Sequence, residues 1–411
     1  MFACALTVML PCTLAVAQGP LSVTLLATDG TQSQFHLAGL SNNQLRVFDD
    51  DRRLVERSTD DFALLTLALE NESSLAPTLG DDQEPLGRLI LTNGQHLAGS
   101  FSGSVNEGEL LRWLHPHFGF FDIPLEHITG WTVGEAALPT ADPMGGDTVV
   151  LSSGEQLAGF LYFTVEDNLT TFQLAPAAAP DDPAIAVPAT SVAAVLLANL
   201  PVASSASAHA RVALQDGSRL DTHNLTLGST TLAFDATVGS RTFRVERPAP
   251  EVKRVLFTTH GRSAVDWVDL DRMVVEPHSG DADAKALWGP NTAGATSTAE
   301  GWTLSAPATL VLELPPKAQR VVGTMSLNLP PNITPERAAW AGCVLHVDIQ
   351  SSQGQTDEPW QATFDAQNPT VAFNLAVPDG AVLIRLTLDS GPRGPVLDTL
   401  KMEDGLVLVG E

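Results

Sequence analysis

The chain has 411 residues, of which 44% are hydrophobic and only 17% charged, and its formal net charge is −26. This length exceeds the size at which single hydrophobic cores stop growing, so several domains are expected. The acidic balance leaves no basic stripe to follow a phosphate backbone or an anionic membrane surface, which disfavours nucleic acid and membranes as partners. The sequence also lacks the run of about 20 apolar residues that predicts a transmembrane helix.

The first 17 residues predict a secretory signal peptide. They carry no charge, are mostly apolar, and end in the small residues Ala15-Val16-Ala17, which suit a cleavage site. We therefore expect cleavage at about Ala17 and a mature protein that is secreted or held in the periplasm or cell envelope. Cys4 and Cys12 would leave with this peptide. Cys343 then stands alone in an alternating apolar run and is expected to be a buried strand thiol.

A short hairpin phrase recurs four times in the first 260 residues. Its turn glycines, Gly30, Gly94, Gly154 and Gly217, lie 64, 60 and 63 residues apart. Asn-Gly or Asp-Gly between alternating runs predicts a hairpin with a type I′ turn, in which both central residues need a positive φ. A hairpin that recurs at a fixed period predicts a repeated small β domain.

Each repeat predicts five short strands, with a single turn before the last of them. In the second repeat Pro124 opens this turn, and Pro188 and Pro248 stand at the same place in the third and fourth. Units of this kind form small barrels that remove their own sheet edges. We predict four barrels, at residues 18–75, 86–137, 146–200 and 209–260, although edge pairing would fuse two repeats into one sheet.

The period stops after Arg262, and residues 263–411 show longer alternating strands. The expected strands are 310–314, 325–329, 345–349, 371–375, 382–388 and 406–408. Strict alternation with Pro and Gly between the strands is typical of a β-sandwich. The predicted fold class is therefore all-β, with four small barrels and a C-terminal sandwich.

Both parts resemble known modules. The strand order and the Gly-x-x-Leu-Ala-Gly phrase at 94–99 and 154–159 resemble the SH3-like, Sm-type barrels found in tandem in secreted bacterial proteins. Residues 263–411 resemble a carbohydrate-binding module of bacterial surface proteins, through 265–270, Gly301-Trp302, 310–323 and the loop 386–398. The second resemblance implies a galactose-binding-like jelly roll that recognises glycan.

Tryptophan is concentrated in the sandwich, where five of the seven lie. Trp267 and Trp302 stand beside strand patterns and are expected in the core. Trp288 and Trp360 stand among polar, Pro and Gly residues and are expected in loops, where a flat ring can hold a sugar face. The acids of a nearby Gly-rich loop complete the predicted ligand site, which comprises Trp288, Trp360, Asp389 and Asp398. The same loop is where a structural Ca²⁺ would be expected.

Three histidines are candidate metal ligands. His115 and His117 flank one residue, so in an extended chain they point the same way, and His127 follows nearby. No third ligand stands at a recognised spacing, and a solvated loop is the alternative interpretation. No cofactor is expected.

The sequence contains no nucleophile elbow, zinc helix or phosphate loop, so we expect no enzyme. The predicted function is a secreted, non-catalytic protein that recognises carbohydrate or a cell-envelope polymer through the sandwich, with the barrels as spacers or interaction units. Two alternatives stay open: an envelope scaffold that binds other surface proteins, and a polysaccharide-active hydrolase.

Overall fold

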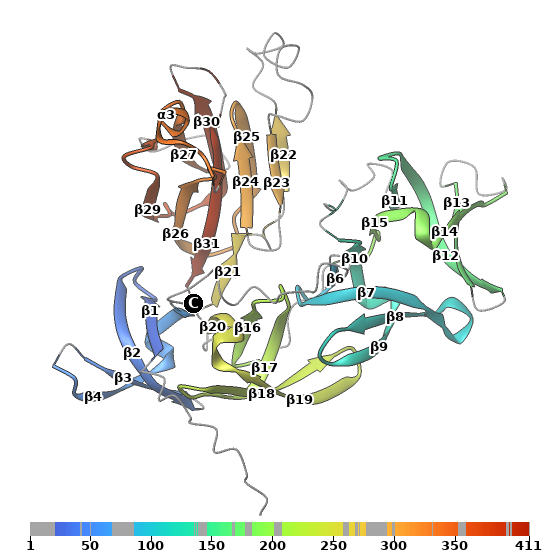
Figure 1. Ribbon diagram of the computed structural model, residues 1–411, viewed down its shortest axis with the longest axis horizontal. Coiled ribbons are helices and arrows are strands. Elements are labelled where there is room, and N and C mark those ends of the chain that lie inside the picture. Colours follow the sequence, from blue (N-terminus) through green and yellow to red (C-terminus); the bar gives the residue numbers. More distant parts are fainter. Residues whose placement is uncertain are drawn as a thin grey trace, which may run out of the picture.

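The computed structural model describes residues 21–41, 43–49, 51–67, 86–134, 136, 138, 146–166, 169–176, 183–200, 208–257, 263–267, 270, 272–276, 294–297, 301–330, 332–351, 359–391, 394 and 397–410. Nearly all of the regular structure in these ranges is β-strand, and the α-helix α3 (Pro335–Ala338) is a single turn (Figure 1). The predicted all-β class is confirmed. No helix in the described part of the chain is long and apolar enough to cross a membrane.

The four repeats share the strand order 5-1-2-3-4. The first strand pairs with the fifth on one side and with the second on the other, and the third and fourth strands follow the second. All pairings are antiparallel, and the described strands fall within the predicted ranges. The strands are β1 (Leu21–Ala27), β2 (Gln32–Ser41), β3 (Gln44–Phe48), β4 (Leu54–Ser58) and β5 (Phe62–Leu67); β6 (Gly87–Leu91), β7 (His96–Val105), β8 (Leu110–His115), β9 (Gly119–Pro124) and β10 (Ile128–Thr132); β11 (Asp147–Leu151), β12 (Gln156–Glu166), β13 (Leu169–Ala175), β14 (Ile185–Pro188) and β15 (Val192–Leu196); and β16 (Ala210–Leu214), β17 (Arg219–Leu227), β18 (Thr231–Val238), β19 (Arg241–Pro248) and β20 (Val252–Phe257).

The predicted hairpin opens every repeat, but its turn is not of type I′. Only the glycine has a positive φ, between 78° and 90°, and its N–H donates to the carbonyl three residues earlier. This is a type I turn followed by a left-handed glycine. The residue before the glycine acts through its side chain, which accepts the N–H of the residue that follows the glycine. These residues are Asp29, Asn93, Ser153 and Asp216.

A single 3₁₀ turn precedes the last strand of each repeat, as the sequence predicts. The turns are η1 (Thr59–Asp61), η3 (Leu125–His127), η4 (Ala189–Ser191) and η5 (Ala249–Glu251), and a further turn, η2 (Asn106–Gly108), joins β7 to β8. Pro124, Pro188 and Pro248 lead into three of them with φ between −60° and −56°, the angle that the proline ring fixes. In the first repeat Ser58 takes this place and accepts the N–H of Asp60.

The last strands of the repeats pair with each other and join the repeats two by two. Strand β5 of the first repeat pairs with β20 of the fourth, and β10 of the second pairs with β15 of the third. The repeats are therefore not four separate sheets, since one hydrogen-bonded path runs through β1–β20. The count of four SH3-like barrels stays a prediction, while the fusion of repeats through their edges is observed.

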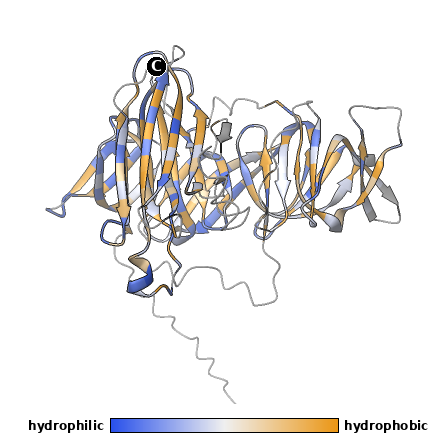
Figure 2. Ribbon diagram, turned by 90° about the horizontal axis from the view of Figure 1, so that it is seen from above, coloured by the Kyte–Doolittle hydropathy of each residue, from blue (hydrophilic) through white to orange (hydrophobic). Residues whose placement is uncertain are grey.

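The C-terminal part is the predicted β-sandwich, with two antiparallel sheets around a common core. The five-stranded sheet runs β22 (Arg272–Glu276), β25 (Ala308–Glu313), β30 (Ala381–Ser390), β27 (Gly342–Ser351) and β28 (Trp360–Asp365); the six-stranded sheet runs β23 (Gly294–Ser297), β24 (Gly301–Ser305), β31 (Thr399–Val409), β26 (Ala318–Leu327) and β29 (Thr370–Ala376), with β21 (Ser263–Asp266) also beside β31. Trp267, Trp302 and Cys343 are buried in this core, as predicted. Hydrophobic and hydrophilic residues alternate along the sandwich strands (Figure 2).

The sandwich is packed onto the first and fourth repeats through its six-stranded sheet. Leu64 of β5 and Leu256 of β20 belong to one buried cluster with Val322 of β26 and Leu408 of β31. The amide of Asn374 on β29 donates to the carbonyl of Gly30 over 2.8 Å. The repeats thus pack against the outer face of the six-stranded sheet.

Candidate functional site

The four residues predicted to form a ligand site do not gather in one place. Trp288 lies outside the described residues. Trp360 begins strand β28 instead of lying in a loop, and it is half-buried with its ring centroid 5.5 Å from that of Phe373. It shares the inward face of β28 with the fully buried Phe364, because the two are an even number of residues apart. The expectation that Trp360 lies in a loop is therefore wrong.

Asp398 is turned inward and holds the Gly-rich loop to the start of β27. Its Oδ1 accepts the N–H of Gly342 over 2.8 Å and its Oδ2 accepts the N–H of Gly391 over 3.0 Å. The side chain is 1% exposed, and burial raises the pKa of its carboxyl group although both hydrogen bonds oppose the rise. Both oxygens of this carboxylate therefore accept backbone N–H groups, one from β27 and one from the Gly-rich loop.

Asp389 faces the other way, onto the outer surface of the five-stranded sheet. Its Oδ2 lies 3.2 Å from Nε2 of His346 on the neighbouring strand β27, and both side chains are partly exposed. On β27 the residues Cys343, Leu345 and Val347 are buried, so the residues between them point outward. Asp389 and Trp360 consequently lie on opposite faces of one sheet.

The outer surface around Asp389 is polar across three strands. Gln361, His346 and Thr387 are direct cross-strand neighbours on β28, β27 and β30, and they form one continuous row. Thr363 on β28 and Asp389 on β30 flank Val344 in the next row. We call this surface, defined by Gln361, His346, Thr387, Thr363 and Asp389, the open face. It presents hydrogen-bond donors and acceptors on three paired strands.

One large exposed aromatic side chain lies in the chain just before β27, the strand that carries His346. Trp340 follows α3 and precedes β27, and it is 55% exposed. The sequence pattern singled out two other tryptophans and missed this one. A usable signal was present: Ala341 and Cys343 continue the inward set of β27, so Trp340 falls outside it.

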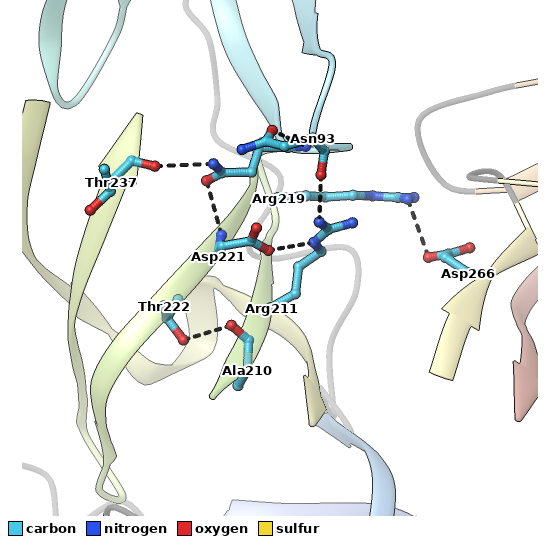
Figure 3. Close-up of polar contacts among 9 residues, drawn as sticks. Asn93, Ala210, Arg211, Arg219, Asp221, Thr222, Thr237 and Asp266 are labelled. Carbon is cyan, nitrogen blue, oxygen red and sulfur yellow. Dashed lines mark hydrogen bonds and ion pairs between the residues drawn. The ribbon is translucent and has the colours of Figure 1, made fainter. Parts of the chain in front are cut away.

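A second polar cluster is buried where the second repeat meets the fourth. Gln95, next to the turn glycine of the second repeat, is 2% exposed; its Nε2 donates to the carbonyl of Thr237 and its Oε1 accepts the N–H of Asp221, each over 3.0 Å. Arg211 binds the carboxylate of Asp221 and the carbonyl of Asn93 (Figure 3). These contacts join repeats that are far apart in the chain.

The same joint extends to the sandwich through Asp266 of β21. Arg219 and Arg254 both direct a guanidinium NH group at Oδ2 of Asp266, and all three side chains are nearly fully buried. Figure 3 shows Arg219 reaching from the fourth repeat toward this carboxylate. Asp266 therefore ties the sandwich to the fourth repeat with charge as well as with apolar packing.

A Ser–His–Asp grouping occurs in this joint, but its geometry does not suit catalysis. Nε2 of His115 lies 3.0 Å from Ser218 Oγ and 3.6 Å from Asp216 Oδ2, so the serine and the acid share one ring nitrogen. Nδ1 accepts the backbone N–H groups of His117 and Phe118, which makes Nε2 the protonated donor. A general base needs the opposite arrangement, and His115 and Ser218 are completely buried.

Of the three histidines considered as metal ligands, His115 and His117 lie side by side, with ring centroids 5.9 Å apart. Both ring nitrogens of His115 are engaged, and His127 is exposed with Nε2 3.9 Å from the carboxylate of Glu126. Within the described ranges no three His, Cys, Asp or Glu side chains come together in a way that could hold a metal ion. Burial raises the pKa of the Cys343 thiol to about 12, which suits its place in the core.

No protein-family model matches this sequence, and no curated protein sequence matches it. Among solved structures, the chain is similar to the fragment of *Clostridium perfringens* ZmpB that contains CBM51-2 with GlcNAc and INT domains, at 13% identity and a TM-score of 0.26 over 46% of this chain and 38% of that one. It is also similar to CBM51 of *C. perfringens* GH95 in complex with methyl-galactose, at 12% identity and a TM-score of 0.25 over 35% of this chain and 99% of that one.

A third similarity is to the tandem CBM51 modules of a family 98 glycoside hydrolase from *Streptococcus pneumoniae*, at 9% identity and a TM-score of 0.26 over 95% of this chain and 88% of that one. The chain spans well under half of the ZmpB fragment. At these TM-scores the similarities carry no argument about the ligand of this chain, which has to be argued from its own surface.

Proposed function

We propose that this protein is exported and binds carbohydrate without catalysis, and that the open face of the sandwich is its binding surface. The observation that carries the proposal is the polar row Gln361–His346–Thr387 beside Asp389, on the sheet whose strand β27 begins two residues after the exposed Trp340. Hydroxyl-rich ligands are recognised by side chains that donate and accept hydrogen bonds together with a flat aromatic surface.

The packing of the molecule favours this face over its counterpart. The outer surface of the six-stranded sheet is occupied by the first and fourth repeats, through Leu64, Leu256, Val322 and Leu408. The open face has the same sheet geometry but carries partly exposed polar side chains. The contacts with the repeats therefore fix the six-stranded sheet, and the proposal assigns the ligand to the other sheet.

The repeats act in this proposal as a rigid support for the sandwich. Their sheets are fused in pairs by β5 with β20 and by β10 with β15, and Asp266 joins the fourth repeat to β21. A support of this kind keeps the open face at a fixed orientation, which lowers the entropy lost when a polymer binds.

The experiment is a glycan array with the full-length protein, followed by titration of the best ligand. Trp340→Ala and the double variant His346→Ala/Gln361→Ala should each weaken binding at least about tenfold, or ~1.4 kcal/mol. Phe160→Ala is the matched control, because Phe160 is 54% exposed on the third repeat, as much as Trp340. The proposal fails if the wild-type protein binds no glycan, or if all three variants bind equally well.

A scaffold that binds other envelope proteins is the second candidate, and one observation favours it. Phe160 and Tyr162 lie two residues apart on β12 and are 54% and 46% exposed, so both rings stand on one face of the strand. Adjacent exposed aromatic residues are typical of protein interfaces. A silent glycan array, together with retention on an envelope protein that Phe160→Ala abolishes, would support this function instead.

A further inference from the structure

A pocket of about 330 Å³ lies on the outer surface of the first repeat, apart from the open face. Its floor is formed by Ser22 and Thr24 of β1, Gln34 and His36 of β2, and Phe48 of β3. These residues point outward because they alternate with core residues, and Ser22–His36, Thr24–Gln34 and His36–Phe48 are direct cross-strand pairs. The volume is at the small end of the range for ligand pockets.

The turn between β3 and β4 forms the wall of this pocket, with Asp49 and Arg52. Asp49 braces the turn, since its Oδ1 accepts the N–H of Arg53 over 2.7 Å and its carbonyl accepts the N–H of Arg52 over 2.9 Å. Arg52 has a φ of 58°, in the left-handed region that glycine adopts without strain and an arginine rarely does. Strained residues of this kind cluster at ligand-binding sites.

The guanidinium group of Arg52 is a fixed positive charge in the pocket wall, which also contains the carboxylate of Asp49. The Arg52 side chain is exposed, and among the described residues no carboxylate lies within ion-pair distance of it. Its neighbour Arg53 pairs with Asp51, at 3.6 Å, and does not line the pocket. Arg52 thus faces the pocket with no ion-pair partner among the described residues, and in a chain with a net charge of −26 it offers a binding group for an anion.

We propose that this pocket binds a hexuronate unit of an acidic saccharide. The carboxylate of the sugar pairs with Arg52, and the ring of Phe48 supplies a flat apolar surface for the sugar face. Gln34, Asp49 and the hydroxyl groups of Ser22 and Thr24 supply the donors and acceptors that sugar hydroxyl groups require. His36 is held beside Ser22, with Nδ1 3.4 Å from Oγ, and adds a second nitrogen near the carboxylate.

The test is isothermal titration of the full-length protein with glucuronate and galacturonate, with glucose and acetate as comparison ligands. We expect a hexuronate to bind at least tenfold more tightly than either glucose or acetate, because only it offers both the ring and the charge. Arg52→Gly should abolish this binding while the melting temperature stays the same or rises, since glycine suits the positive φ. A folding defect and a binding defect are thereby separated.

Two further variants make the outcome decisive. Arg53→Gln removes the same charge one residue away and should leave binding within twofold, and Trp340→Ala should leave it unchanged because it affects only the open face. The proposal is overturned if no hexuronate binds at about 10 mM, tenfold above a millimolar Kd. It is equally overturned if glucose binds as well as the hexuronates, or if Arg53→Gln weakens binding as much as Arg52→Gly.

Discussion

The imidazole of His115 donates a hydrogen bond to the hydroxyl of Ser218, and this contact joins the second repeat to the fourth at a place that water does not reach. The two atoms are 3.0 Å apart and both side chains are completely buried. Ser218 Oγ also accepts the N–H of Ala98 over 3.1 Å. The joint therefore depends on the neutral form of the histidine, which has consequences for stability as the pH falls.

Stability should decrease between pH 6.5 and pH 4. Burial lowers the pKa of His115 to about 4, against the opposing charge of Asp216, and burial holds the pKa of His96 well below its usual value. In this range the unfolded chain binds these protons and the folded chain does not, so the free energy of unfolding falls as the pH falls. For His115 the full loss is about 3 kcal/mol. Urea unfolding at a series of pH values measures it.

The control for this prediction is His127, whose side chain is 51% exposed. His115→Gln should lower stability at pH 7 but make it less dependent on pH, while His127→Gln should leave the pH dependence as it is in the wild-type protein. Identical pH profiles for the wild-type and His115→Gln proteins would contradict the account of the joint.

Gln95 should matter far more than the residue at the same place in the third repeat. Gln95→Ala leaves the carbonyl of Thr237 and the N–H of Asp221 without this partner, inside a buried joint. We expect a loss of about 2–4 kcal/mol, from two buried groups at ~1–2 kcal/mol each. Glu155 also follows its turn glycine but is exposed, so Glu155→Ala should change stability by less than about 0.5 kcal/mol. Thermal unfolding of both variants provides the measurement.

The glycine that ends the Gly-x-x-Leu-Ala-Gly phrase should tolerate a side chain much less than Gly39, which follows Leu37-Ala38 in the first repeat but does not end this phrase. The phrase ends at Gly99 in the second repeat and at Gly159 in the third, where an added Cβ would meet a carbonyl oxygen in both cases. Gly99 has a φ of 146°, and a Cβ there would collide with the carbonyl oxygen of Leu114. At Gly39 of the first repeat the nearest atom to an added Cβ is 3.6 Å away. Gly99→Ala should therefore cost about 2–4 kcal/mol and Gly39→Ala less than about 1 kcal/mol. Equal losses in chemical denaturation would show that the close approach is not what the phrase preserves.

Local features of the fold followed from the sequence because they depend on neighbouring residues. The turn glycines and the prolines before the 3₁₀ turns each indicate a backbone angle. The alternation that includes Leu345 and Val347 indicates which face of the strand is buried. The type of turn was wrong, since Asp29 and its counterparts were taken as residues with positive φ when they act through their side chains. Composition does not distinguish these two uses of an Asp-Gly pair.

Contacts between repeats could not be predicted in the same way. That β5 pairs with β20 and not with β10 depends on the shape of whole repeats, and the short apolar strands are alike in composition. Of the residues that define the open face, only Asp389 was predicted from the sequence, for a related reason. His346 and Gln361 are ordinary outward residues in their own strands, and only the register of β27 with β28 places them side by side.

Asp266 should be the residue on which the union of the sandwich with the repeats depends most. Its carboxylate is 6% exposed and faces the buried guanidinium groups of Arg219 and Arg254. Replacing it with asparagine removes the carboxylate that both buried guanidinium groups face, and breaking a buried ion pair in this way costs about 3–5 kcal/mol. The apolar cluster of Leu64, Leu256 and Leu408 is unchanged in this variant. Calorimetry of Asp266→Asn should therefore show the sandwich and the repeats unfolding in separate transitions, at lower temperature than the wild type. Asp389→Asn, which alters a partly exposed carboxylate on the open face, should keep the wild-type profile, and a matching profile for Asp266→Asn would mean that apolar packing alone holds the two parts together.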